Sequence, residues 1–142
     1  MKALFSIFGL SIAAFSTVAF ACECVGFSSI EEHVEAADAI FLANAVETYS
    51  IEIPPNKIIE DHVTQFEVIE VLKGDVGDEV SIFHYVYPGA CEVIFEPGKI
   101  YEVFALTRND GEMKTSNCIL APYEREHFNW GWKDYRKVAN NH

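Results

Sequence analysis

Short runs of apolar, β-branched and aromatic residues recur along most of this chain, and several alternate with polar residues at every second position. A period of two is typical of strands with one buried face. We expect strands over residues 39–49, 64–72, 79–86, 93–95 and 99–106, with a returning segment over 112–117. Five or six short strands joined by tight turns indicate an all-β domain, either a small antiparallel barrel or a sandwich.

Turn sequences separate these runs. They are Lys73-Gly74-Asp75, Pro97-Gly98, Asn109-Asp110-Gly111, and Pro54-Pro55-Asn56, which opens a polar loop. Within residues 64–72 the apolar phase shifts, because Phe66 and Val68 are followed by Ile69 and Val71. A slip of one residue predicts a β-bulge near Val68.

A short helix is predicted ahead of the first strand, over residues 30–37. Ser28 and Ser29 each stand three residues before a glutamate, which is the spacing of a capping box. We expect the inner stripe of this helix to be Ile30, Val34 and Ala37. Its solvated face would carry Glu31, Glu32 and Glu35.

The first 21 residues form a separate segment. Lys2 gives a minimal positive start, residues 3–14 are largely apolar, and Ala19-Phe20-Ala21 matches the small-x-small site of signal peptidase. A membrane anchor is the alternative, because the apolar stretch is nearly long enough to span a bilayer. Its hydroxyl residues and the Ala-x-Ala pattern favour cleavage, so we expect a signal peptide over 1–21 and an exported chain that begins at Cys22.

Charge excludes two classes of function. The 142-residue chain carries 10 Lys and Arg against 22 Asp and Glu, a formal charge of −12, and removing Lys2 makes it −13. Such a chain lacks the cations that neutralise nucleic-acid phosphates, and it is unsuited to adsorb on an anionic membrane. Half of its residues are hydrophobic, so we expect one folded domain rather than disorder.

All four cysteines lie in the exported part of the chain: Cys22, Cys24, Cys91 and Cys118. An even count in an oxidising compartment predicts two disulfides, for which three pairings are possible. A bridge between near neighbours would constrain little, so we expect Cys22 and Cys24 each to reach a distant partner. Such bridges close loops of about 70–95 residues and are each worth about 4–5 kcal/mol in the chain-entropy model.

The Cys-x-Cys pair has two alternative chemistries. A metal or redox site is one, although the export signal argues against it. Lipidation of Cys22 directly after the cleavage site is the other, although Phe20 fits that processing poorly.

The remaining polar and aromatic residues suggest no catalytic site. The five histidines lack the spacing of metal ligands, so we interpret them as surface or strand residues: His33, His62, His84, His127 and His142. Neither a Ser-His-Asp order nor a glycine-rich phosphate loop stands out. Residues 124–142 form a polar extension, partly helical, whose rings we expect to pack on the domain rather than to bind a ligand: Phe128, Trp130, Trp132 and Tyr135.

A series of fragments over residues 22–123 carries a family resemblance. The expected mature start is Cys22-Glu23-Cys24-Val25. The others follow in order: Ala37-Asp38-Ala39-Ile40-Phe41, Phe66-Glu67-Val68 to Leu72-Lys73-Gly74, Ala90-Cys91, Phe95, Gly98, Tyr101, Thr115 to Cys118, and Ala121-Pro122-Tyr123. Their order and the cysteine spacing together resemble the inhibitory domain of the tissue inhibitors of metalloproteinases.

This resemblance implies a fold, a disulfide pairing and a mechanism. The fold would be a netrin-like, closed antiparallel OB-fold barrel, with Cys22 bridged to Cys91 and Cys24 to Cys118. The free α-amino group and backbone carbonyl of Cys22 would chelate the catalytic zinc of a protease, at the position that such sites keep open for water. The ridge contacting the protease would comprise Glu23, Cys24, Val25, Pro88, Gly89, Ala90 and Cys91.

The sequence departs from the family in three places. The family's third disulfide in this domain is missing, because no cysteine lies between Cys24 and Cys91. Its second, disulfide-rich domain is replaced by residues 124–142. Glu23 stands where the family has a small polar residue that enters the protease's specificity pocket. A carboxylate there loses hydration, so we expect a target pocket with Arg or Lys, weak inhibition, or none.

Two hypotheses follow. The first is a non-enzymatic, secreted inhibitor of zinc metalloendopeptidases, outside the cell or in the periplasm, monomeric and with no cofactor or metal ion of its own. Its partner would be the protease; we expect no nucleic-acid partner and, after signal cleavage, no membrane. The alternative is a netrin-like binding or adhesion module in which the disulfides are purely structural. An enzyme ranks last.

Overall fold

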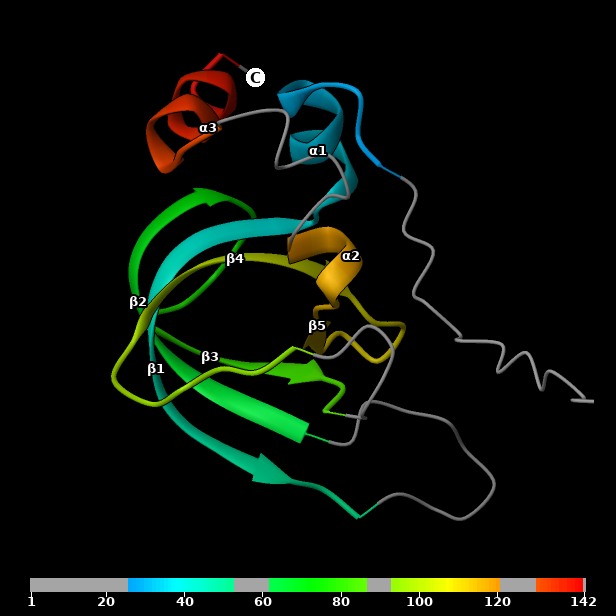
Figure 1. The fold of residues 1–142 in the computed structure, drawn as a ribbon, viewed down its shortest axis with the longest axis vertical. Coiled ribbons are helices and arrows are strands. Elements are labelled where there is room, and N and C mark those ends of the chain that lie inside the picture. The colour runs from blue at the N-terminus through cyan, green and yellow to red at the C-terminus, as the bar shows by residue number, and fades with distance from the viewer. Residues whose placement is uncertain (1–25, 53–61, 87–92, 121–129, 142) are drawn as a thin grey trace, which may run out of the picture.

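The computed structural model describes residues 26–52, 62–86, 93–120 and 130–141. In these residues five strands form a closed barrel in the order β1-β2-β3-β5-β4 (Figure 1). The strands are β1 (Ala39–Ser50), β2 (His62–Lys73), β3 (Glu79–His84), β4 (Ile100–Thr107) and β5 (Met113–Lys114). The helices are α1 (Ile30–Ala36), α2 (Asn117–Leu120) and α3 (Trp132–Ala139).

The predicted fold class is confirmed. The described chain is mainly β with a few short helices, and the closed barrel is consistent with an OB-like fold. One detail of the antiparallel prediction is wrong, because β3 and β5 pair in parallel, whereas the other neighbours are antiparallel. Strand directions cannot alternate all the way round a closed ring with an odd number of strands, so one pair must be parallel.

Small residues on β1 make room for aromatic rings inside the barrel. Ala39, Ala43 and Ala45 are fully or almost fully buried in the barrel core. The space is filled by rings such as Phe66 and Phe95, whose centroids lie 4.9 Å apart in an edge-to-face arrangement. Buried aromatic rings contribute large apolar areas, and this geometry adds a favourable quadrupolar contact.

The predicted bulge on β2 is confirmed. Leu42 of β1 pairs with Glu70 and Ala43 pairs with Val68, so Ile69 is left between two pairs. The side chain of Ile69 is accordingly exposed. The bulge changes the apolar phase of β2, as the sequence pattern of that strand indicated.

A second core lies outside the barrel, where α1 and α3 lie side by side and α3 contacts β2 (Figure 1). Its buried members are Val34, Ala37, Ile40, Phe104, Ile119 and Tyr135. Trp130 and Trp132 pack against this cluster, which confirms the packing role predicted for them. Phe128 lies outside the described residues.

Helix α1 ends one residue before the predicted boundary. Ala37 is extended, with φ −88° and ψ 138°. The ammonium group of Lys73 donates hydrogen bonds to the carbonyl oxygens of Val34 and Ala37, at 2.8 and 2.6 Å. A cation at this end satisfies carbonyl groups that have no partner within the helix.

Two predicted strands differ in the structure. Residues 93–95 form no strand, and the returning strand is only Met113–Lys114, so that Cys118 lies in helix α2. All three residues of this run are apolar, but only Val93 and Phe95 are buried, and Ile94 is exposed. Backbone groups of this segment form hydrogen bonds although the segment belongs to no strand. Val93 N–H donates to the carbonyl oxygen of Tyr85 at 2.9 Å, and the carbonyl oxygen of Phe95 accepts from the Thr48 hydroxyl at 3.3 Å.

Candidate functional site

The predicted zinc-chelating residue Cys22 and the two segments of the predicted contact ridge, Glu23–Val25 and Pro88–Cys91, all lie outside the described residues. The same holds for the signal-peptide residues and for three of the four cysteines. Cys118 is described, in α2. The predicted disulfide pairings therefore remain predictions. The structure describes the residues that flank the two ridge segments, and we call these flanking residues the frame.

The chain that follows Val25 is fixed to the barrel by stacked rings. Phe27 stacks on the imidazole of His33 with centroids 4.5 Å apart and an interplanar angle of 18°. The other face of that imidazole stacks on Phe104 of β4 at 4.2 Å and 12°. Because β4 belongs to the barrel, Phe27 is held two residues after the predicted ridge.

The predicted cap at the start of α1 is confirmed at Ser29, but the reciprocal bonds of the Glu32 carboxylate go to Ser28 rather than to the N-cap backbone, so the capping box is not closed in its standard form. Ser29 is the N-cap, and its hydroxyl accepts a hydrogen bond from Glu32 N–H at 3.2 Å. The Glu32 carboxylate accepts from the Ser28 hydroxyl at 2.6 Å and from Ser28 N–H at 2.8 Å. These bonds stabilise the charged form, so the pKa of Glu32 lies below its usual value. The solvated face is confirmed too, since Glu31, Glu32 and Glu35 are exposed.

His33 is the residue that sequence analysis missed, because it is neither a surface nor a strand residue. It lies in α1 and is fully buried. Its Nε2 lies 2.6 Å from the carbonyl oxygen of Ile119, and its Nδ1 lies 2.8 Å from the hydroxyl of Tyr135. A carbonyl can only accept, so Nε2 carries the proton and donates to it. When the ring is neutral, this leaves Nδ1 as the acceptor for the Tyr135 hydroxyl.

A second buried histidine holds both ends of the other ridge segment. His84, at the end of β3, places Nδ1 2.9 Å from the carbonyl oxygen of Val93 and Nε2 2.7 Å from the Thr64 hydroxyl. The Thr48 and Thr64 hydroxyls are 2.7 Å apart. Since Val93 N–H also bonds to the Tyr85 carbonyl, the chain before residue 87 and the chain after residue 92 meet as neighbours.

Helix α2 links the two halves of this frame. Just ahead of it, Thr115 N–H donates to the Phe83 carbonyl of β3 at 2.9 Å, and the Thr115 hydroxyl donates to the Phe104 carbonyl of β4 at 2.7 Å. Within α2, Ile119 accepts the hydrogen bond of His33. Cys118 is adjacent to Ile119, so this cysteine lies in the segment that bonds both to β3 and to His33.

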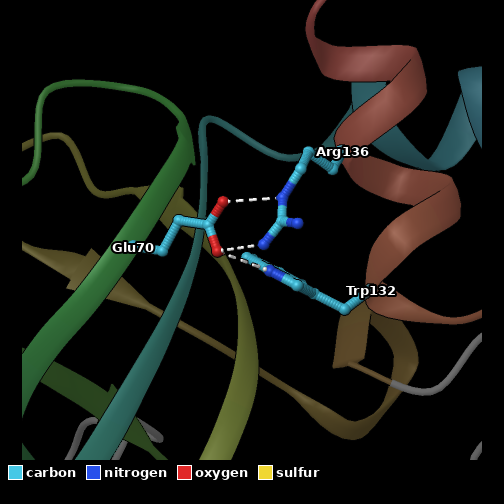
Figure 2. A network of polar contacts seen from close by, with 3 residues as sticks. All are labelled: Glu70, Trp132 and Arg136. Atoms are coloured by element: carbon cyan, nitrogen blue, oxygen red, sulfur yellow. Dashed lines mark hydrogen bonds and ion pairs between the residues drawn. The ribbon is translucent and has the colours of Figure 1, made fainter.

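Helix α3 is attached to the barrel by a polar cluster, which Figure 2 shows. The carboxylate of Glu70 on β2 accepts from Arg136 through both oxygens, at 2.8 and 2.5 Å, and from the indole N–H of Trp132 at 3.0 Å. The bidentate bond of Arg136, with that of Trp132, lowers the pKa of Glu70, and the same pairing raises the pKa of Arg136.

Comparison with known proteins gives no family. No family model matches this chain, and no curated protein matches it. In the part of the chain that the structure describes, no helix is long and apolar enough to cross a membrane. Nor does any group of three or more His, Cys, Asp or Glu side chains in those residues have the arrangement of a metal site.

Proposed function

We propose that this protein is a secreted inhibitor of zinc metalloendopeptidases, acting outside the cell or in the periplasm through the mature N-terminal residue Cys22. The proposal assigns the chain to the tissue inhibitors of metalloproteinases, whose inhibitory domain it resembles over residues 22–123. Support comes from the closed five-strand barrel, which is the fold that this resemblance implies.

One observation carries the proposal further. The described residues that flank the two ridge segments converge on α2, the helix that holds Cys118. On one side Phe27 stacks on His33, which bonds to Ile119; on the other, Thr115 bonds to β3 just before its end.

The predicted bridge between Cys24 and Cys118 is compatible with these distances. Cys24 precedes Phe27 by three residues, which is at most about 11 Å of extended chain. A disulfide needs Cα atoms about 4.4–6.8 Å apart. Phe27 and Ile119, the neighbour of Cys118, both contact His33, which supports this bridge.

The inhibitory chemistry needs a free, basic amine at Cys22. A catalytic zinc ion keeps one coordination position for water, and the neutral α-amine with the adjacent carbonyl oxygen would take that position. The reference pKa of an α-amine is about 8, so the neutral form is accessible near pH 7. Bridging Cys22 to Cys91 would order the chain end before binding and reduce the entropy lost on association.

The decisive test begins with the identity of the N-terminus. Intact-mass measurement of the exported protein should give a chain that begins at unmodified Cys22, and titration against a panel of zinc endopeptidases should show stoichiometric inhibition of at least one. A variant with one alanine added ahead of Cys22 should lose inhibition, because the amine becomes an amide nitrogen. The matched control carries the added alanine after His142 and should inhibit normally.

Each contrary outcome has a defined meaning. An acylated Cys22, or unchanged potency of the N-terminally extended variant, would exclude the chelating mechanism. A correctly processed protein that inhibits no member of the panel would favour the netrin-like binding or adhesion module with structural disulfides.

Glu23 sets the expected target class. A carboxylate entering a specificity pocket needs a cationic partner to replace its lost hydration, so we propose a target whose pocket carries Arg or Lys. Exchanging Glu23 for Thr should weaken inhibition of that protease and strengthen inhibition of those with apolar pockets. The same potency against every protease would show that Glu23 enters no pocket.

A further inference from the structure

We propose that His33 is a positioning residue for the N-terminal segment, and that the C-terminal helix α3 holds His33 in position through Tyr135. The proposal concerns how the chain ahead of α1 is fixed to the barrel. Its consequence for inhibition rests on the proposed function, whereas its structural part does not.

The imidazole of His33 makes close contacts in four directions. Its two faces stack on Phe27 and Phe104, and its two ring nitrogens bond to Ile119 and Tyr135. These four partners come from the segment ahead of α1, from β4, from α2 and from α3. A planar ring with a donor on one edge and an acceptor on the other suits this position, since an apolar ring would leave the polar groups of Ile119 and Tyr135 without these bonds.

The Tyr135 hydroxyl is what the C-terminal helix contributes. Tyr135 is fully buried, packs edge-to-face on Phe104 at 4.9 Å, and its hydroxyl lies 2.8 Å from His33 Nδ1. Its helix is in turn attached to β2 through the Glu70 carboxylate (Figure 2). A path of contacts therefore runs from β2 through α3 and His33 to Phe27.

No covalent bond between α1 and the barrel can replace this path. Residues 25–90 contain no cysteine, so residues 26–36 carry no disulfide of their own and, beyond any bridge at Cys22 or Cys24, are fixed to the barrel by packing and hydrogen bonds. Interactions of this kind open locally without unfolding the rest of a protein. The fixing of Phe27, three residues after Cys24, therefore depends on a residue more than a hundred positions away in the sequence.

The test is the variant Tyr135→Phe, which removes one hydroxyl and keeps the ring. We expect amide hydrogen exchange in residues 26–36 to become faster by about 3- to 10-fold, the factor that one hydrogen bond represents, with no change in the strands. The matched control is Tyr101→Phe, which removes the hydroxyl that accepts a hydrogen bond from Glu96 N–H at 2.8 Å. That control should leave residues 26–36 unchanged.

A spectroscopic measurement distinguishes positioning from general support. Nitrogen-15 NMR of the His33 ring should show the Nε2–H tautomer in the wild type, and the Nδ1 resonance should move in Tyr135→Phe but not in Tyr101→Phe. Glu70→Gln provides a second route, because it loosens α3 without touching His33. It should give the same exchange pattern with a smaller factor.

The inhibition assay is kept separate. If the proposed function holds, Tyr135→Phe should weaken inhibition by about the factor seen in exchange, because the less ordered segment loses more entropy on binding. Unchanged exchange in residues 26–36, or equal acceleration throughout the barrel, would overturn this inference whatever the inhibition. A wild type that inhibits nothing would overturn the proposed function and leave the exchange result to decide the inference.

Discussion

The variant Gly74→Ala tests the close backbone contact between the turn after β2 and the start of β1. This residue directly follows β2 and has φ +89°, a backbone conformation that costs an L-residue about 1–2 kcal/mol. A methyl group here would also lie 2.7 Å from the carbonyl oxygen of Asp38 and 3.0 Å from the Cα of Ala39. Both are backbone atoms at the start of β1, so neither can rotate away.

The expected cost follows from these two contributions. Overpacking of a well-packed site costs about 1–3 kcal/mol, and the reduced freedom of the unfolded chain returns about 0.4–1 kcal/mol. With the backbone cost, we expect Gly74→Ala to lower the free energy of unfolding by about 2–4 kcal/mol. That is a large share of the stability of a small domain.

Gly98→Ala is the control that separates the two contributions. Gly98 has a similar φ of +81°, but a methyl group there meets nothing within 4 Å. We expect it to cost about 1 kcal/mol, from the backbone alone. The assay is urea unfolding followed by far-UV circular dichroism, with the slope m checked so that the midpoints report stability. Equal losses for the two variants would refute the steric reasoning at Gly74.

Three further predictions concern polar contacts. The bond to Arg136 is the main reason that the pKa of Glu70 is lower in the folded protein than its unfolded value of 4.5, so the Glu70 carboxylate stabilises the fold above pH 4.5 and this stabilisation is lost as the pH falls through the folded pKa. In thermal melts, the stability difference between wild type and Glu70→Gln should therefore be largest near pH 7 and vanish in acid; a difference that does not change with pH would contradict this. Ser29→Ala removes the N-cap of α1 and should cost about 1 kcal/mol in urea unfolding, whereas the exposed Ser50→Ala should cost almost nothing; equal costs would argue against the cap. Thr64→Val keeps the shape but removes the hydroxyl bonded to both His84 and Thr48, and should cost about 1–3 kcal/mol in the same assay; a neutral result would show that these two bonds together contribute no net stability.

The sequence predicted best those features that depend on the local pattern of a single strand or helix. The strand over 39–49 became β1, the bulge near Val68 was found one residue away at Ile69, and the capping serines start α1. In each case the signal is local, since alternation, a phase slip or a cap spacing follows from the backbone geometry of one element.

Features set by distant contacts could not be predicted in this way. The apolar run of residues 93–95 could not show which side chains face inward or whether a neighbouring strand lies beside them. His33 looked polar on a helix that was expected to bury only aliphatic residues. Its burial depends on Ile119 and Tyr135, which lie 86 and 102 residues away, and no short-range pattern encodes such partners.

β1 explains why the barrel and its N-terminal attachment can be perturbed separately. Phe41 points into the barrel core, while its neighbour Ile40 belongs to the outer core under α1 and α3. Strand β1 thus separates two apolar clusters, and its backbone hydrogen bonds to β2 on one side and to β4 on the other hold it in place. Loosening α3 removes packing from the outer cluster only, and the ladders and inner rings keep the barrel closed. Exchange confined to residues 26–36 is therefore a meaningful signal, because this architecture lets the attachment of the N-terminal segment fail while the barrel remains folded.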